Sequence, residues 1–179
     1  MSTPAGLCRY VSGDIVQFSS TTHHRLMPMG RTQLRLNTFG ENVLEKQITD
    51  SLLKVCADRS WVSINFHVAP HFEKKLTGKT VGRHEWWIEL EPGTVDTPTG
   101  PILSAALDKE LCRHNSTYAA QRKEGVFDVP FVRLVIPGVF AHWLKHNETW
   151  DPQGQIPHCH EQRDIADGLA QLARFTKDE

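Results

Sequence analysis

Alternating hydrophobic and polar positions predict two strands in the middle of the chain. A period of two is typical of a strand that buries one face. In residues 61–68 the hydrophobic face consists of Val62, Ile64, Phe66 and Val68. In residues 84–90 it consists of Trp86, Ile88 and Leu90, opposite Glu85, Trp87 and Glu89. We therefore expect Trp86 in the core and Trp87 half covered on the outer face, with an exposed polar loop over residues 74–79.

Helical spacing of hydrophobic residues predicts several helices. The first runs from about Gly40 to Ala57, because Leu44, Ile48, Leu52 and Val55 share one face and Thr38–Glu41 has the S/T-x-x-E form of a capping box. Further helices are predicted at 101–114, at 116–124 with Gly125 closing the end, after Pro137–Gly138, and at 163–175. Residues 131–136 are apolar except for Arg133 and predict another strand.

The first thirty residues have a different pattern, that of short antiparallel strands. Strands are expected at residues 9–11, 15–18 and 25–27, with a polar loop over residues 22–24. The expected fold class is α/β, and more closely α+β, with a mixed β-sheet flanked by helices and preceded by a small antiparallel β segment. The segment Pro28–Thr32 separates the two parts, so we expect a β segment over 1–30, a second domain over 31–179, and a possible hinge between them.

Composition excludes several classes of protein. Lys and Arg total 20 and Asp and Glu total 21, giving a net charge of −1. The balance gives no electrostatic reason to expect a nucleic acid or a membrane surface as a partner. The chain contains no run of 18 apolar residues, and its first residues lack the basic and then apolar pattern of a signal peptide. These features predict a cytoplasmic protein.

The cysteines and histidines do not form a recognisable metal motif. The four cysteines include no C-x-x-C pair. The densest group of potential ligands is His158–Cys159–His160, whose successive side chains would point to opposite sides of an extended chain. We expect no metal site, although a small hydrolase or metal enzyme built on these three residues stays open as an alternative. Nothing in the sequence indicates a cationic pocket that would stabilise a Cys159 thiolate.

Two residues near the N-terminus have side chains suited to nucleotide contacts. Asp14 follows Gly13 in a predicted turn, where a carboxylate can accept hydrogen bonds from vicinal hydroxyls such as those of a ribose. Arg31 follows Gly30 and can bind a phosphate or carboxylate with two hydrogen bonds. The residues alone leave another interpretation open for each: Asp14 bonded to its own turn, and Arg31 solvated.

Short motifs follow one another along the chain in a specific order. They are Gly6–Asp14, Gly30–Thr32 with Asn37–Glu41, His84–Trp86, Leu107–Asp108 with Asn115–Arg122, Arg133–Phe140 with Trp143–Leu144, and Gly154–Gln155 before Arg163–Asp167. In this order the sequence resembles the C-terminal part of the auxin-responsive acyl-acid amido synthetase family, and its bacterial members most closely. These enzymes are distant relatives of the luciferase-type adenylate-forming enzymes. The resemblance covers nearly the whole chain.

The resemblance implies a mobile domain of an amide-forming ligase. Enzymes of the family make an acyl-adenylate from ATP and a carboxylic acid, release pyrophosphate, and then let an amine attack. Their smaller C-terminal domain turns about a hinge between the two half-reactions. The large N-terminal domain, which holds most of the nucleotide and acyl pocket, has no counterpart in this sequence. The resemblance therefore implies no cofactor for this chain by itself, and ATP with magnesium only together with a partner domain.

The resemblance assigns roles to particular residues. Asp14 matches the aspartate that holds the ribose hydroxyls of the nucleotide, and Arg31 matches an arginine at the hinge that contacts the nucleotide. The hinge itself corresponds to Gly30 and Arg31. Glu41 matches a Phe-Gly-Glu segment just after the hinge.

One departure from the family pattern concerns catalysis. The family sequence Gly-Gln-x-Lys-aliphatic-Pro-Arg corresponds here to Gly154–His158, which is two residues shorter. The family lysine is therefore absent near Gln155 and Ile156, and His158 stands where an arginine is expected. Losing one contact that offsets charge on a transferring group typically costs on the order of 10²-fold in rate. We assign no catalytic residue, although Lys145 in the preceding predicted helix is an alternative cation.

The expected function is a stand-alone, degenerate C-terminal domain of an ATP-dependent acyl-adenylate-forming amide synthetase. Such a domain would act with, or regulate, an adenylating partner and would be inactive by itself. The alternative is a non-catalytic binding or scaffold module that retains only the fold. Strands within residues 7–29 would expose an edge and an apolar surface, and such surfaces are usually covered. We expect an adenylate-forming protein or a second copy of the chain to cover them.

Overall fold

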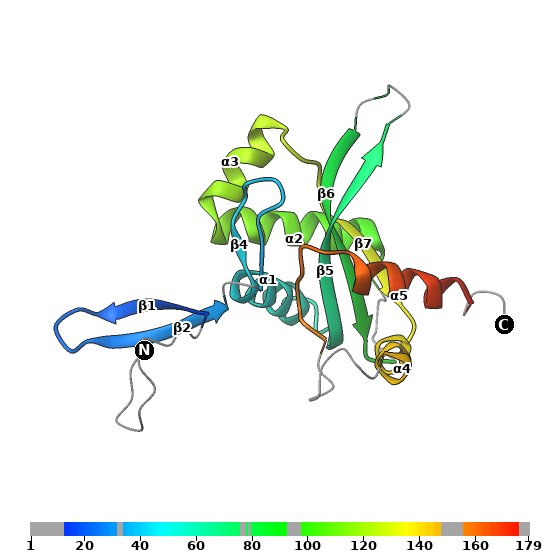
Figure 1. Cartoon of the computed structure of the whole chain (residues 1–179), viewed down its shortest axis with the longest axis horizontal. Helices are drawn as coiled ribbons and strands as arrows, with labels where there is room; N and C mark the ends of the chain where they lie inside the picture. Colours follow the sequence, from blue (N-terminus) through cyan, green and yellow to red (C-terminus); the bar gives the residue numbers. More distant parts are fainter. Residues whose placement is uncertain are drawn as a thin grey trace.

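A mixed β-sheet lies at the centre of the molecule (Figure 1). The computed structural model describes residues 13–31, 34–75, 78, 80–92, 98–147 and 156–175. Within these ranges the sheet has three strands: β5 (Ser63–Lys74), β6 (Thr80–Leu90) and β7 (Phe131–Val135), in the order β5-β6-β7. β5 and β6 are antiparallel, whereas β7 runs parallel to β6. The mixed sheet predicted from the sequence is confirmed.

Helices cover both faces of this sheet (Figure 1). α1 (Glu45–Ala57), α2 (Gly100–His114) and α3 (Ser116–Glu124) enclose one core with Trp86 and Ile88. α4 (Val139–His146) and α5 (Asp164–Phe175) enclose a second core with Trp87. Trp86 is buried as expected, but Trp87 is only 1% exposed. The prediction of a half-covered Trp87 was wrong because the α4–α5 layer buries the second face of the sheet as well.

The start of α1 differs from its prediction. The helix begins at Glu45, not near Gly40, and the side chain of Gln47 accepts the backbone N–H of Leu44 at 3.1 Å. Two short paired strands, β3 (Arg35–Leu36) and β4 (Val43–Leu44), precede it. The predicted capping box at Thr38–Glu41 was wrong, because the Glu41 carboxylate accepts the N–H of Phe39 inside a tight turn.

The other predicted helices are confirmed as α2 to α5. α3 ends at Gly125, which has the left-handed φ of +71° that the sequence predicted for a closing glycine. Asn115 caps the start of the same helix by accepting the Tyr118 N–H at 2.8 Å. Across the described ranges, every helix is too short or too polar to cross a membrane.

β5 is longer than predicted and its pairing is irregular at one point. The register with β6 shifts between Ser63 and Asn65, so the alternation does not continue along the whole strand. Val62 and Ile64 are consequently 53% and 46% exposed, whereas Phe66 and Val68 are buried as expected. Lys74, predicted in a loop, is the last residue of β5.

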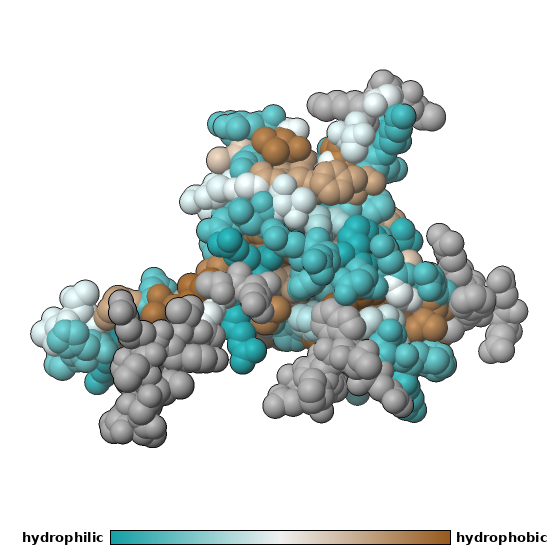
Figure 2. All heavy atoms as spheres, in the orientation of Figure 1, coloured by the Kyte–Doolittle hydropathy of each residue, from teal (hydrophilic) through white to brown (hydrophobic). Residues whose placement is uncertain are grey.

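An antiparallel hairpin projects from this body (Figure 1). It consists of β1 (Asp14–Ser20) and β2 (Arg25–Arg31), which confirms the predicted pairing; the strand expected at residues 9–11 lies outside the described residues. In the register of the hairpin, alternate residues share one face. That face carries Val16, Phe18, Leu26 and Pro28. Phe18 and Leu26 are 60% and 54% exposed, and hydrophobic residues are visible along the hairpin in Figure 2.

Gly82 in β6 lies where a side chain would meet Phe39. A Cβ atom there would come 2.0 Å from Phe39 Cε1, and the Phe39 ring is itself packed against the rings of Phe72 and Phe127. We expect Gly82→Ala to lower the free energy of unfolding by about 1–3 kcal/mol, measured by urea titration. In a Phe39→Ala background the added cost should largely vanish. The same cost in both backgrounds would contradict this packing.

Candidate functional site

Asp14 and Arg31, the two residues suited to a nucleotide, lie side by side on the hairpin. Asp14 opens β1, Arg31 ends β2, and the two are partners in the strand register. Arg31 Nε lies 3.9 Å from Asp14 Oδ1. Their side chains are 71% and 49% exposed for Arg31 and Asp14 respectively. Gly30, the other predicted hinge residue, immediately precedes Arg31 in the same strand.

This pair can contribute two kinds of contact to one ligand. A carboxylate accepts hydrogen bonds from neighbouring hydroxyls, and a guanidinium donates in parallel to a phosphate. An exposed ion pair of this kind contributes roughly 0–1 kcal/mol to stability. The ion pair itself therefore contributes little to the stability of the fold.

A buried hydrogen-bonded pair of side chains fixes the turn that follows the hairpin. Glu41 and His84 are fully buried, with Glu41 Oε1 2.8 Å from His84 Nε2. Glu41 Oε2 accepts the Phe39 N–H at 2.7 Å. Burial alone raises the pKa of Glu41, but the hydrogen bond and charge of His84 outweigh it, so the pKa is lowered overall. Sequence reasoning found Glu41 only through the resemblance, and it missed His84 as the partner.

A second buried carboxylate joins the sheet to α5. Glu85, only 1% exposed, accepts from Arg133 Nε at 2.6 Å and from an Arg163 guanidinium nitrogen at 2.7 Å. Arg163 also donates to the Pro70 carbonyl at 2.6 Å. Burial raises the pKa of Glu85, and the two arginines lower it more strongly, so the net shift is downward. The signal in the sequence was Arg133, the one charged residue of an otherwise apolar predicted strand.

His158, Cys159 and His160 extend the edge of the sheet. Cys159 pairs with Val68 of β5: the Val68 N–H donates to the His158 carbonyl at 2.9 Å, and the His160 N–H donates to the Val68 carbonyl at 3.1 Å. The His158 ring stacks on Phe66, with 4.3 Å between centroids. Cys159 is buried, and burial raises the pKa of its thiol, which opposes thiolate formation.

The described ranges hold no group of three or more His, Cys, Asp or Glu side chains that could bind a metal ion.

His67 contacts the same segment. Its Nδ1 lies 2.7 Å from the Pro157 carbonyl oxygen. Gly154 and Gln155 lie outside the described residues, and the segment from Ile156 to His160 contains no lysine. The segment is thus positioned by backbone hydrogen bonds to Val68 and His67 and by the stacking of the His158 ring on Phe66.

Together these features define an α+β domain with a projecting hairpin and a helix-covered mixed sheet. The sequence model of the GH3 family C-terminal domain matches residues 44–164, more than half of the chain. The chain therefore belongs to this family, which confirms the resemblance found in the sequence.

Solved structures share the fold. A GH3.15 acyl acid amido synthetase superposes with a TM-score of 0.72 at 15% identity, covering 96% of this chain and 32% of the other. AtGH3.15 acyl acid amido synthetase in complex with 2,4-DB gives 0.70 at 14% identity, covering 96% and 31%. This chain thus spans about a third of the length of the solved structures it matches. No curated protein matches it.

The burial of His67 predicts that the stability of the fold depends on pH. Burial lowers the pKa of His67 to about 4, from its ordinary value of 6.5. Below pH 6.5 the unfolded chain binds a proton here that the folded chain does not bind until about pH 4, so stability falls as the pH drops through this window. The loss is about 3 kcal/mol, at roughly 1.4 kcal/mol per pKa unit.

Urea unfolding at pH 7 and pH 4 tests this effect. His67→Phe removes the titrating group while keeping a ring of similar size, so its loss of stability between the two pH values should be about 3 kcal/mol smaller. His23→Gln, in the exposed turn of the hairpin, should behave like the unmodified chain. An equal loss in His67→Phe and the unmodified chain would mean that folding does not lower the pKa of His67.

Proposed function

We propose that this chain acts as the C-terminal domain of an acyl-adenylate-forming amide synthetase, together with a separate adenylating part. The observation that carries the proposal is the Asp14–Arg31 pair, exposed at the base of the hairpin and 3.9 Å apart. Asp14 would accept hydrogen bonds from the ribose hydroxyls, and Arg31 would donate to a phosphate oxygen. Membership of the GH3 family supports this choice of ligand.

Two half-reactions would use this contact. In the first, a carboxylate oxygen of the acid attacks the α-phosphorus of ATP and pyrophosphate leaves. In the second, an amine attacks the acyl carbon, AMP leaves with the bonding electrons, and the nitrogen gives up a proton to solvent to leave the amide. Gly30 and Arg31 would form the hinge between the two orientations, with residues 1–30 as the β segment and 31–179 as the moving domain. The buried Glu41–His84 contact ties the turn after the hinge to β6, so the body would move as one unit.

Catalysis by this chain alone is not part of the proposal. The segment from Ile156 to His160 carries no lysine to offset charge on the phosphoryl group. Lys145 on α4 is exposed and has no assigned role. In this proposal ATP and magnesium are bound with the partner's pocket, and this chain supplies a lid or regulates it in the cytoplasm.

The partner would dock on the hairpin within residues 7–29. Val16, Phe18 and Leu26 leave about half or more of their surface exposed on one face. Burying apolar surface contributes roughly 25 cal/mol per Å². Because the nucleotide pair lies on the same hairpin, an adenylating protein is the partner that would use both features. A second copy of the chain is the other candidate, and size-exclusion chromatography of the chain alone separates the two.

Nucleotide binding is tested by titrating AMP into the ¹⁵N-labelled full chain mixed with the adenylating part of a GH3 protein, and following amide shifts. Shifts should concentrate around Asp14 and Arg31. Asp14→Asn and Arg31→Gln should each weaken binding about tenfold, because each removes a charge-assisted hydrogen bond. The matched exposed variants Asp50→Asn and Arg113→Gln should bind AMP like the unmodified chain.

The ribose contact has its own control. Replacing AMP by 2′-deoxy-AMP should weaken binding to the unmodified chain but add nothing to the loss in Asp14→Asn. Losses that simply add would show that Asp14 does not touch the ribose.

Activity is tested by ATP–pyrophosphate exchange with the adenylating part of a GH3 protein expressed as a separate polypeptide. We expect no exchange from this chain alone and exchange from the mixture that Arg31→Gln reduces. A stable complex that shows no exchange would support the alternative, a non-catalytic binding or scaffold module. Exchange by the chain alone would contradict the proposal.

A further inference from the structure

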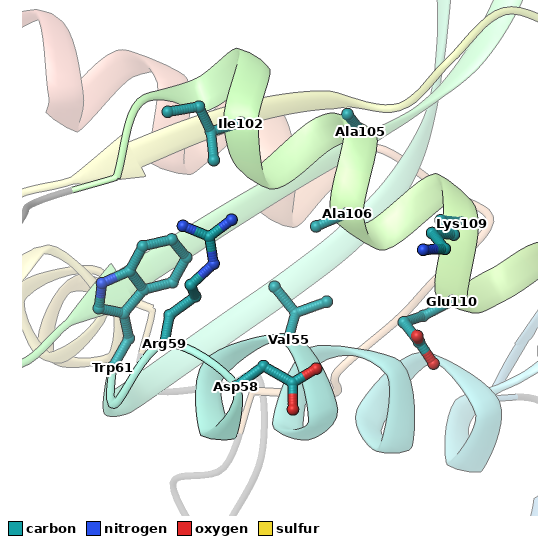
Figure 3. A pocket seen from close by; sticks show the side chains of 9 residues that line it. All are labelled: Val55, Asp58, Arg59, Trp61, Ile102, Ala105, Ala106, Lys109 and Glu110. Atoms are coloured by element: carbon teal, nitrogen blue, oxygen red, sulfur yellow. The ribbon is translucent and has the colours of Figure 1, made fainter.

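A groove of about 520 Å³ lies between the end of α1 and the outer face of α2 (Figure 3). Its apolar surface comes from Val55, Trp61, Ile102 and Ala106. Arg59 and Lys109 lie toward opposite ends, and the Arg59 guanidinium points from the end of α1 toward Ile102 (Figure 3). Small-molecule sites are typically concave, mostly apolar and about 300–1,000 Å³ in volume, with a few polar groups. The groove has these properties.

The charges around the groove are unequally satisfied. Its two carboxylates, Asp58 and Glu110, already have cationic partners outside it: Lys54 binds Asp58, and Arg113 binds Glu110 at 2.8 Å. The two cations, Arg59 and Lys109, have no carboxylate partner among the described residues. Arg59 rests over the Trp61 ring, 5.8 Å from its centroid, and Lys109 forms no ion pair with a described residue. The groove therefore offers two uncompensated positive charges beside an apolar floor.

From this charge pattern we infer that the groove binds a small apolar molecule that carries a carboxylate. The hydrocarbon part lies on Val55, Trp61 and Ala106, and the carboxylate accepts hydrogen bonds from Arg59 or Lys109. A neutral apolar molecule would leave both cations without a partner, and an amine would be repelled by them. The inference uses no residue of the hairpin, so it stands or falls separately from the proposed function.

Octanoate is the probe, with octylammonium and 1-octanol as matched controls that keep the chain length and change the head group. The ¹⁵N-labelled full chain is titrated, and the indole N–H of Trp61 is followed after assignment by Trp61→Phe. Octanoate should shift the Trp61 signal and amides of α1 and α2 to saturation. 1-Octanol should bind at least about tenfold more weakly, and octylammonium should not bind in the groove.

The variant Arg59→Gln/Lys109→Gln should weaken octanoate binding at least about tenfold, because it removes both cations and leaves the apolar floor. Lys123→Gln/Lys145→Gln removes two exposed cations from α3 and α4 and should leave binding unchanged. Three results would overturn the inference: no octanoate shift at Trp61, equal affinity in the two double variants, or shifts confined to β1 and β2. Binding of an acidic amphipathic peptide without binding of octanoate would also overturn it, in favour of a protein partner.

Discussion

An ionisable side chain on a strand that is buried on both faces needs a hydrogen-bond partner, and β6 carries three such groups. Leaving a buried donor or acceptor without a partner costs about 1–3 kcal/mol, and more for a charged group. His84 is paired with Glu41, Glu85 with Arg133 and Arg163, and Glu89 accepts the Gly138 N–H at 2.6 Å. Each partner belongs to a different part of the chain. The polar residues of one strand thus decide where the turn before α1, strand β7, the start of α4 and the start of α5 can lie.

The hairpin is held by a different kind of interaction. β1 and β2 pair with each other and, in the described part of the chain, with no third strand. Val16, Phe18, Leu26 and Met27 are exposed, and so is the Asp14–Arg31 contact. The molecule therefore combines a body whose parts are linked by buried polar contacts with a hairpin that has few such links. Bending near Gly30 and Arg31 would break none of the buried contacts of β6, which is compatible with the hinge proposed above.

The sequence predicted those features that depend on local pattern. The helical stripe of Leu103, Leu107 and Leu111 and the closing Gly125 needed no knowledge of distant residues, and both α2 and the end of α3 are confirmed. The misses depended on tertiary contacts. Glu41 looked like a capping residue because nothing local showed that His84, 43 positions away, would take its carboxylate. Trp87 looked half exposed because alternation cannot show that a second helix layer covers the other face.

The features of the candidate site also differ in how far the sequence alone could predict them. Asp14 and Arg31 could be named from the resemblance, but their register across the hairpin could come only from the structure. The groove beside Trp61 could not be anticipated, since it combines the end of one helix with the outer face of another and depends on which carboxylates already have partners.

The segment from Ile156 to His160 joins the sheet mainly through its backbone. The His158 carbonyl and the His160 N–H pair with Val68, and the Pro157 carbonyl bonds His67, while the His158 ring stacks on Phe66. Backbone pairing does not depend on which side chains the segment carries. A side-chain substitution in this segment would therefore leave these backbone bonds in place. The proposed loss of a lysine from the segment is thus compatible with an intact fold, because the fold depends here on backbone pairing and on the buried contacts of β6.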